Sequence, residues 1–339
     1  MKPSTRTMLV PLVSVLAALL LNACIIALSG RDPGMIFSKM LHATLTSPYG
    51  QGQVLFRTTT LICTALAVAL PFRLRLFNIG AQGQLLMGAF AAAVTGALLP
   101  AGLASPVSVS ACILAAMTAG ALWAAMAALL KTRFGVSEVI STIMLNFIAE
   151  GIAGYLLTRH FALPSTVHTA PIAGSAIIPT FSALGGWFRN APANPSLFLA
   201  LAAALIFYLL IFKTRFGFEM RAAGLRPEAA RHAGIQPERH VMAAMALGGA
   251  AAGLAAANLV LGYKHFYEAG MTGGAGFTGI AAALLAGAHP LWLVVSAGFL
   301  AFLEYGGLAV NAYVPKDIFM VMEAVTIIFV VAFTALGKR

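Results

Sequence analysis

Long apolar runs separated by short polar segments dominate this chain. A helix that crosses a membrane needs roughly 20 mostly apolar residues, and runs of that kind recur from one end of the sequence to the other. We therefore predict an all-α polytopic membrane protein, a single transmembrane domain over residues 1–339 with about ten spans. The predicted spans cover residues 8–28, 55–72, 77–99, 107–130, 138–158, 196–213, 241–261, 272–288, 291–310 and 318–336.

The most polar stretch of the chain runs from residue 213 to residue 240, between the sixth and seventh predicted spans. It holds three glutamates and six basic residues, namely Lys213, Arg215, Arg221, Arg226, Arg231 and Arg239. Elsewhere the charged residues come singly or in pairs. This segment is therefore predicted to lie in water beside the membrane.

Composition and charge agree with the membrane class. The chain is 60% hydrophobic and 9% charged, with a mean hydropathy of +0.91, whereas a soluble domain carries about 25% charged residues. The net charge of +11 does not indicate nucleic-acid binding, because the basic residues lie in short segments between apolar runs. With a cytoplasmic N-terminus, ten spans place 14 of the 21 basic residues inside and seven outside. This bias predicts that both termini are cytoplasmic.

The sequence carries no signal of catalysis. It contains no phosphate-binding loop, no H-E-x-x-H and no G-x-S-x-G motif. Cys24, Cys63 and Cys112 lie inside apolar runs without the spacing of metal ligands. We interpret them as small buried side chains, and we expect no enzymatic activity from this chain alone.

Two predicted spans begin with polar, glycine-rich sequence where an apolar run is expected. The third opens with FNIGAQGQ at residues 77–84, and the eighth opens with GMTGGAGFTG at residues 270–279. Interrupted spans at matching places in two halves indicate an inverted repeat with a site between the copies, here spans 2–5 and 7–10. The alternative is that glycine only permits close helix packing, as in the Gly249-x-x-x-Gly253 pattern of the seventh span.

Polar side chains inside the predicted spans need a protein partner or a water-filled path, because a carboxylate in lipid costs about 2.5–3.5 kcal/mol. In the fifth span, Asn146 and Glu150 are four residues apart and share one helical face. We predict that such groups line a path for a polar solute; the alternative is hydrogen bonding between helices. The candidate path residues are Asn78, Gln82, Gln84, Asn146, Glu150 and Glu304.

Two long segments, residues 29–54 and 159–195, are rich in Pro, Gly, Ser and Thr. We predict that both are outer loops. Loops of this length are either functional or merely tolerated, so each is expected to cover the outer face or to contact a partner.

The polar segment is predicted to contain a short helix. Pro227 suits its first turn and Gly234 its left-handed end, and Glu228 precedes two basic residues at helical spacing. The residues that would form a small, flat apolar face are Leu225, Ala229, Ala230 and Ala233. We predict that this helix inserts into a groove of another protein; the alternative is an interfacial helix on lipid headgroups.

Four blocks of sequence, in order, resemble the permease subunits of ABC importers for simple sugars and nucleosides. The segment FGFEMRAAGLRPEAARHAGI at 216–235 is similar to the coupling-helix motif, and FNIGAQGQLLMGA at 77–89 is similar to the third-span signature. SEVISTIMLNFIA at 137–149 and GFTGIAAALLAGAHP at 276–290 resemble two further blocks, closest to the branch that works with basic-membrane-protein-type nucleoside-binding lipoproteins. Gln82 departs from the pattern, since many relatives are expected to have a glutamate there.

The resemblance implies a permease subunit for nucleosides in a bacterial inner membrane, where two permeases, commonly different chains, form the pathway. Cytoplasmic ATPase subunits would hold ATP and magnesium, so this chain would bind no cofactor, and an extracytoplasmic substrate-binding protein would deliver the solute. Membrane lipid would surround the chain, and no nucleic acid would bind. The residues expected to couple to the ATPase are Arg221, Gly224, Pro227, Glu228, Ala229, Ala230 and Gly234.

Other functions stay open at the level of sequence. A simple sugar such as a pentose is the alternative substrate for the same role. A proton-coupled secondary transporter would use Glu150 or Glu304 as the proton carrier, but it would not need the basic segment with its helix. A structural membrane subunit or a channel is a third class, and the interrupted spans and buried acids argue against a purely structural role.

Overall fold

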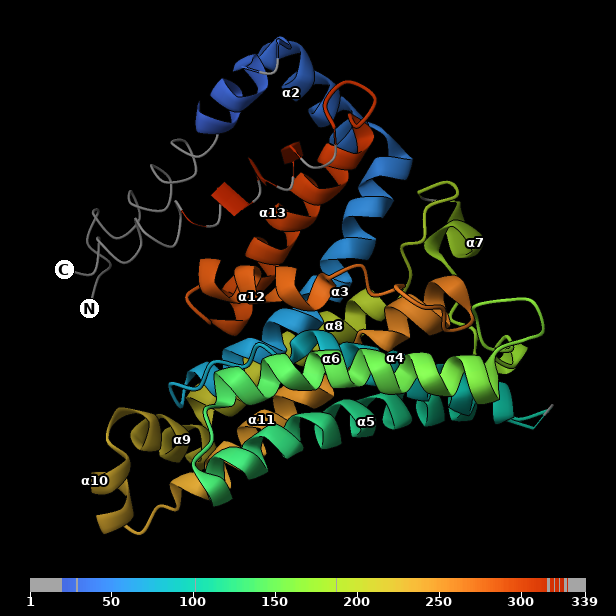
Figure 1. The fold of residues 1–339 in the computed structure, drawn as a ribbon. Helices are drawn as coiled ribbons and strands as arrows, with labels where there is room; N and C mark the ends of the chain where they lie inside the picture. Colours follow the sequence, from blue (N-terminus) through green and yellow to red (C-terminus); the bar gives the residue numbers. More distant parts are fainter. Residues whose placement is uncertain are drawn as a thin grey trace.

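The computed structural model describes residues 20–28, 30–100, 102–186 and 188–315, and positions 318, 319, 321, 322, 324, 325 and 328. The regular secondary structure of this part is helical, with isolated bridges at Ala162–Thr169 and His168–Glu268. Seven helices among the described residues are long and apolar enough to cross a membrane. The chain is therefore an α-helical, polytopic membrane protein (Figure 1).

The elements follow one another with few long connections. The long helices are α3 (Pro48–Phe72), α4 (Ala81–Leu98), α5 (Ser105–Phe134), α6 (Glu138–Leu156), α8 (Ser196–Lys213), α11 (Pro237–Leu254) and α13 (Pro290–Ala309). Wide π-helical turns extend α6 and α11, as η2 (Leu157–Phe161) and η4 (Ala257–Lys264). The shorter elements are α2 (Pro33–Leu41), η1 (His42–Thr46), η3 (Gly174–Ala176), α7 (Phe181–Gly185), α9 (Arg215–Leu225), α10 (Pro227–His232) and α12 (Ala275–Leu285).

The long helices coincide with the predicted second to seventh spans and with the ninth. The eighth predicted span, 272–288, is instead the 11-residue α12, which at about 16 Å is too short to cross a membrane alone. Gly270, Gly273 and Gly274 have left-handed backbones and delay its start. The first predicted span is helical at 20–28; the rest of it, and most of the tenth, lie outside the described residues.

The prediction that residues 29–54 form a loop is wrong, because α2, η1 and the start of α3 occupy this segment. The side chains of Asp32 and Ser47 accept hydrogen bonds from the amides of Gly34 and Gly50. Proline follows each of these capping residues in the first helical turn. Asp-Pro and Ser-Pro are helix-start signals, and a reading of composition alone mistakes them for loop residues.

The centre of the bundle is formed by α3 and α11. In each, 83% of the membrane window is buried, against 33% for α5, α6 and α8. α11 packs along α5, α13 packs along α3, and α4 lies against both α5 and α11. The helices with little burial present wide apolar faces to the surroundings.

Close packing at this centre depends on glycines where two backbones touch. A Cβ atom added to Gly249 of α11 would lie 2.2 Å from the carbonyl oxygen of Gly120 of α5. One added to Gly253 would lie 2.2 Å from the carbonyl oxygen of Ala116. The Gly249-x-x-x-Gly253 pattern is therefore a helix-packing motif.

We predict that Gly249→Ala destabilises the protein by about 1–3 kcal/mol, the usual cost of overpacking. The clashing atom is a backbone oxygen, so the helices must separate to admit the methyl group, although alanine favours a helix by about 0.5–1 kcal/mol over glycine. The measurement is unfolding of the purified protein in detergent. Gly151→Ala is the matched control, because a Cβ at Gly151 meets nothing within 4 Å; equal stability of the two variants would contradict the packing role.

Candidate functional site

The two interrupted spans meet at the starts of α4 and α12. Nε2 of Gln82, in the first turn of α4, donates a hydrogen bond to Oγ1 of Thr272 over 2.8 Å. Its Oε1 accepts one from the amide of Gly276, in the first turn of α12, over 2.9 Å. A Cβ on Gly276 would lie 2.3 Å from Cα of Gln82. One side chain thus holds the two helix starts in direct contact.

Asn78 and Gln84, near Gln82 in the sequence, pair with each other and are both buried. Nδ2 of Asn78 donates to Oε1 of Gln84 over 3.1 Å, and Nε2 of Gln84 donates to Oδ1 of Asn78 over 3.0 Å. Asn78 also donates to the carbonyl oxygen of Ala67 in α3 and accepts from the amide of Gly80. Asn78 therefore pairs the amide of Gly80, which the interruption leaves without a helical partner. The carbonyl oxygen of Ala67 lacks a partner for another reason, because Pro71, four residues later in α3, has no N–H to donate.

Side chains of α6 pair further backbone groups of the interrupted segment. Nδ2 of Asn146 donates to the carbonyl oxygen of Ile79 over 2.9 Å, and its Oδ1 accepts from the amide of Gly83 over 2.8 Å. Oγ1 of Thr142 accepts from the amide of Ile79 over 3.3 Å. The sequence analysis did not single out Thr142, although it lies four residues before Asn146 and hence on the same face of the helix.

Glu150 lies one turn beyond Asn146, and its environment is different. It is exposed, whereas Asn146 is only 8% exposed. Its charge acts on Tyr267, in the segment before α12: burial, and secondly this charge, raise the pKa of the Tyr267 phenol. The structure therefore places Glu150 at the protein surface, beside the amide cluster formed by Asn78, Gln84 and Asn146.

Glu304 does not join this group. It pairs with Arg57 of α3, with 3.4 Å between Oε1 and Nε, and the Arg57 guanidinium lies 5.4 Å from the ring centroid of Tyr305. Arg57 precedes Ala67, the partner of Asn78, by ten residues of one helix, which corresponds to about 15 Å. Of the six predicted path residues, the structure brings Asn78, Gln82, Gln84 and Asn146 together and leaves Glu150 beside them.

A second buried amide cluster, which the sequence analysis missed, lies at the wide turn η4. Nδ2 of Asn258 donates to the carbonyl oxygen of Phe56 and to Oγ1 of Thr60, each over 2.8 Å. Nδ2 of Asn194, just before α8, donates to Oδ1 of Asn258 over 2.9 Å. The signal in the sequence was Asn258 itself, a lone asparagine inside the apolar seventh span.

The predicted short helix of the polar segment is confirmed as α10, which begins at Pro227 and is followed by Gly234 at φ +80°. Leu225, Ala229 and Ala233 are exposed, whereas Ala230 is 5% exposed and faces the protein. The predicted apolar face is therefore divided. α10 projects with α9 from one end of the bundle, and α7 lies at the opposite side of the molecule (Figure 1).

The preceding helix α9 was not predicted. The side chain of Thr214 caps it by accepting a hydrogen bond from the amide of Gly217 over 3.1 Å. Glu219 connects α9 to α11, since it pairs with Arg215 at 2.7 Å and with His240 at 3.2 Å. The hydrogen bond from Arg215 is the main reason that the pKa of Glu219 is lowered. The polar segment is thus a folded pair of helices rather than a loose loop.

Two contacts hold α9 against the membrane helices, one at its backbone and one through a side chain. A Cβ on Gly224 would lie 2.2 Å from the carbonyl oxygen of Arg73, just after α3. The Arg221 guanidinium lies 5.3 Å from the ring centroid of Phe212, in the last turn of α8. Both predicted coupling residues therefore face the membrane domain and hold α9 against it.

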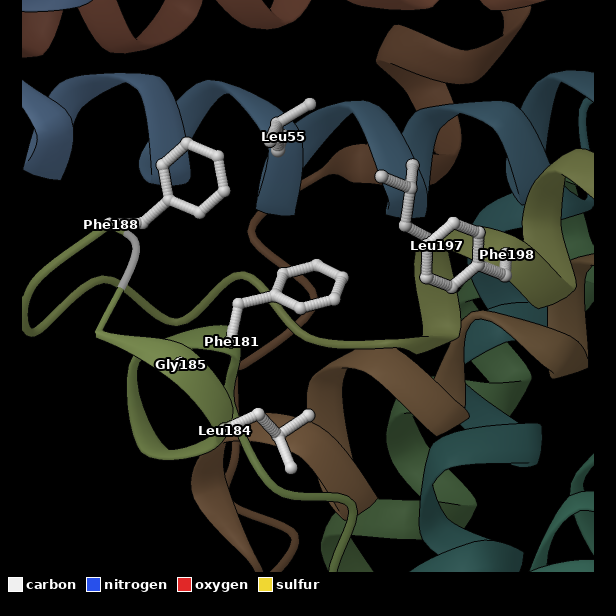
Figure 2. A pocket seen from close by; sticks show the side chains of 7 residues that line it. All are labelled: Leu55, Phe181, Leu184, Gly185, Phe188, Leu197 and Phe198. Carbon is white, nitrogen blue, oxygen red and sulfur yellow. The ribbon is translucent and has the colours of Figure 1, made fainter.

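An apolar pocket of about 420 Å³ lies between α3, α8 and the segment that contains α7. Figure 2 shows Leu55 of α3 and Leu197 and Phe198 of α8 around it, with Phe181 and Phe188 on the other side. None of its seven lining residues has a polar side chain, so the pocket does not fit a solute rich in hydroxyl groups. Within the described residues, no three potential metal ligands gather.

Comparison with known proteins gives consistent results. The guanosine ABC transporter permease NupP of Bacillus subtilis is 34% identical over 95% of this chain and 92% of its own length. The glucose ABC transporter permease TsgB13 of Haloferax volcanii is 33% identical over 95% of this chain and 86% of its own length. NupQ, another guanosine permease of Bacillus subtilis, is 29% identical over 72% of this chain and 77% of its own length. No solved structure shows significant similarity.

The family described as "Branched-chain amino acid transport system / permease component" matches residues 52–331. This range includes both interrupted spans, the amide clusters and the pair of helices α9 and α10. The chain therefore belongs to this family of ABC transporter permeases.

Proposed function

We propose that this chain is the permease subunit of an ABC importer for nucleosides in a bacterial inner membrane. The observation that carries the proposal is its similarity, over 95% of its length, to the guanosine permease NupP. The membrane-spanning bundle and the exposed helix α10 support it. The glucose permease TsgB13 is similar to almost the same degree, so a simple sugar such as a pentose is the alternative substrate.

The proposed assembly has several chains. ATP and magnesium belong to separate ATPase subunits that bind the polar segment from the cytoplasm, and an extracytoplasmic substrate-binding protein delivers the solute. A second, different permease completes the pathway, since NupP and NupQ are two guanosine permeases of one organism. The wide exposed faces of α5, α6 and α8 leave room for that chain and for lipid.

The proposed topology has ten spans, cytoplasmic termini and two inverted copies, spans 2–5 and 7–10. The packing of the helices supports the repeat. The fourth and seventh spans pack together as α5 and α11, and the ninth and second pack together as α13 and α3; a two-fold axis that exchanges the copies relates these two pairs. The second helix of each copy, α4 or α12, follows an interruption.

The proposed ATPase-binding surface is centred on α10. Glu228 and Ala229 are exposed on it, and Pro227 and Gly234 define its ends. The side of α9 and α10 that faces the protein carries Arg221, Gly224 and Ala230. In this proposal these residues make the two helices move together with the membrane domain.

The proposed solute pathway passes the exposed face of α6. Glu150 lies 12 residues into this helix, or about 18 Å from its start, where a carboxylate facing lipid would cost about 2.5–3.5 kcal/mol. That cost favours water or the second permease on this face. Gln82 supplies the polar contact between the two interruptions, while Asn78, Gln84 and Asn146 support the wall.

The competing function is proton-coupled transport through Glu150 or Glu304. Glu304 lies 3.4 Å from the Arg57 guanidinium and outside the group of amides near Glu150, so it does not adjoin the proposed pathway. Glu150 has no such cation among the ion pairs of the described residues, so it is the residue on which the two functions differ.

The proposed function is tested by reconstitution. The chain is purified with its associated subunits, placed in liposomes, and supplied with labelled guanosine or pentose, with and without ATP. Uptake of guanosine that needs ATP and survives a proton uncoupler supports the proposal. Purification without an ATPase, together with uptake that a proton gradient drives, would overturn it.

We predict that Glu228→Lys abolishes ATP-driven uptake while the protein still reaches the membrane, because it reverses a charge on the exposed face of α10. Gly224→Arg should have the same effect, since its side chain would displace α9 from Arg73. The measurements are uptake in vesicles and the amount of ATPase that co-purifies. Gly174→Arg is the control, because Gly174 is exposed and its Cβ would meet nothing within 4 Å; normal uptake by Glu228→Lys would exclude α10 as the coupling helix.

We predict that Glu150→Gln lowers nucleoside uptake by about 2- to 10-fold, the effect of losing one hydrogen bond to the solute or to water. Uptake should stay dependent on ATP and insensitive to an uncoupler. The measurement is the initial rate in liposomes, with Glu304→Gln as the comparison. Complete loss of uptake, together with loss of proton movement, would instead identify Glu150 as a proton carrier.

A further inference from the structure

A cluster of arginines and aromatic rings joins the polar segment to the short helix α12, and the family match assigns it no role. Its members come from four parts of the chain. Arg73 follows α3, Phe212 lies in the last turn of α8, Arg221 lies within α9, and His289 precedes α13. We infer that this cluster transmits the movement of α9 and α10 to the interrupted spans, an inference that rests on the proposed function.

The ring of Phe212 is the centre of the cluster. The guanidinium carbons of Arg73 and Arg221 each lie 5.3 Å from its centroid. The His289 ring stacks on it, with centroids 5.2 Å apart and planes inclined by 28°. Tyr208, one turn earlier in α8, contacts both rings at 5.4 and 5.7 Å. A displacement of Arg221 with α9 therefore acts directly on groups from α3 and from the start of α13.

Arg73 contacts both the helix that moves and the turn that receives the movement. Its carbonyl oxygen lies against Gly224 of α9, where a Cβ would come within 2.2 Å. Its Nη2 donates a hydrogen bond of 2.5 Å to the carbonyl oxygen of Ala288. Ala288, at φ +54°, is in a left-handed conformation that residues with a Cβ rarely adopt. The turn between α12 and α13 is thus held by the same residue that touches α9.

The helix α12 carries this contact to the site. It ends at Leu285, three residues before Ala288, and its first turn contains Gly276, which accepts the close approach of Gln82. Thr64 of α3 donates from Oγ1 to the carbonyl oxygen of Ala275 over 3.1 Å. Because α12 is a single helix of 11 residues, a shift at its end also shifts its start.

The cluster has features of an arrangement that can change. Burial, and secondly the charge of Arg221, lower the pKa of Arg73. The two like charges on one ring therefore oppose close approach of α9. Among the described residues, Nε of Arg73 and Nδ1 of His289 are buried without a hydrogen bond. Like charge and these two polar atoms therefore gather where α3, α9 and α13 meet.

The test uses two substitutions that keep the charge or the apolar character of the side chain and remove the planar contact. Arg73→Lys keeps the cation but loses the flat guanidinium, and Phe212→Leu keeps an apolar side chain but loses the ring. Each variant is purified with its partner subunits, and solute transported per ATP hydrolysed is measured in liposomes. Arg75→Lys, two residues from Arg73 and exposed, is the matched control.

We expect both variants to assemble with the ATPase and to hydrolyse ATP, while solute transported per ATP falls about 5-fold to 150-fold, the range of typical coupling between sites. The double variant should be little worse than either single one, because both remove the same contact. Spin labels at exposed Phe218 of α9 and exposed Phe277 of α12 should change their separation on ATP binding in the parent protein, and less in Arg73→Lys.

Unchanged transport per ATP in both variants would overturn the inference, and so would an unchanged separation of labels in the parent protein. Failure of the parent protein to associate with an ATPase is a different result, because it overturns the proposed function before any variant is made. If Arg73→Lys does not assemble, Phe212→Leu alone decides, since it alters no charge and no hydrogen bond of the turn.

Discussion

Backbone groups that leave a helix inside a membrane must find partners within the protein, and the interrupted third span shows how this chain meets that constraint. The segment before α4 frees the amide and carbonyl groups of Ile79, which Thr142 and Asn146 pair. Asn78 pairs the amide of Gly80 and the carbonyl oxygen of Ala67, and Gln84 pairs Asn78 in turn. The amides therefore cannot turn toward a solute without exposing backbone. Gln82 is held in the same way, because its Oε1 accepts from the amide of Gly276. In the proposed pathway this leaves the exposed Glu150 as the group that meets a passing solute.

Close packing around the interruption explains why the bundle tolerates it. Gly249 and Gly253 bring the backbone of α11 against α5, and Gly279 of α12 meets Thr64 of α3 at a distance that excludes a Cβ. A second amide cluster, built on Asn194 and Asn258, pairs groups of α3 at the wide turn η4. The interruption before α4 and the wide turn η4 thus each have their own buried asparagines. Stiff packing of this kind transmits displacement, since cores are bistable rather than continuously deformable.

The sequence predicts the long helices well because twenty apolar residues in a row have one common explanation in a membrane protein. It also identifies α10 from Pro227 and Gly234, whose backbone preferences are local. It falls short in two ways: some local helix caps were overlooked, and distant partners cannot be identified from the pattern. The loop prediction for residues 29–54 overlooked the caps Asp32 and Ser47, and α9 was missed although Thr214 caps it. The partners of Asn78 and Asn146 are 11 and 67 residues away, so their pattern predicts a need for hydrogen bonds without showing who supplies them.

The shortness of α12 explains why this helix, rather than a full membrane span, is the element proposed to move. A helix of full span, anchored at both membrane faces, resists displacement along its axis, whereas α12 has 11 residues and is flanked by two turns. One is the turn at Gly287 and Ala288, both at positive φ, and the other is the run of Gly270, Gly273 and Gly274, also at positive φ. Arg73 donates a hydrogen bond to Ala288 in the first turn, and Gln82 donates one to Thr272 in the second. Gln82 and Thr64 hold the start of α12, and Arg73 holds the turn at its end. In the proposed transmission, α12 moves as a rigid body between these contacts while the glycine contacts of α11 stay intact. In the proposed transmission, the glycines that shorten the eighth span are therefore also the positions where the backbone would adjust when α9 moves.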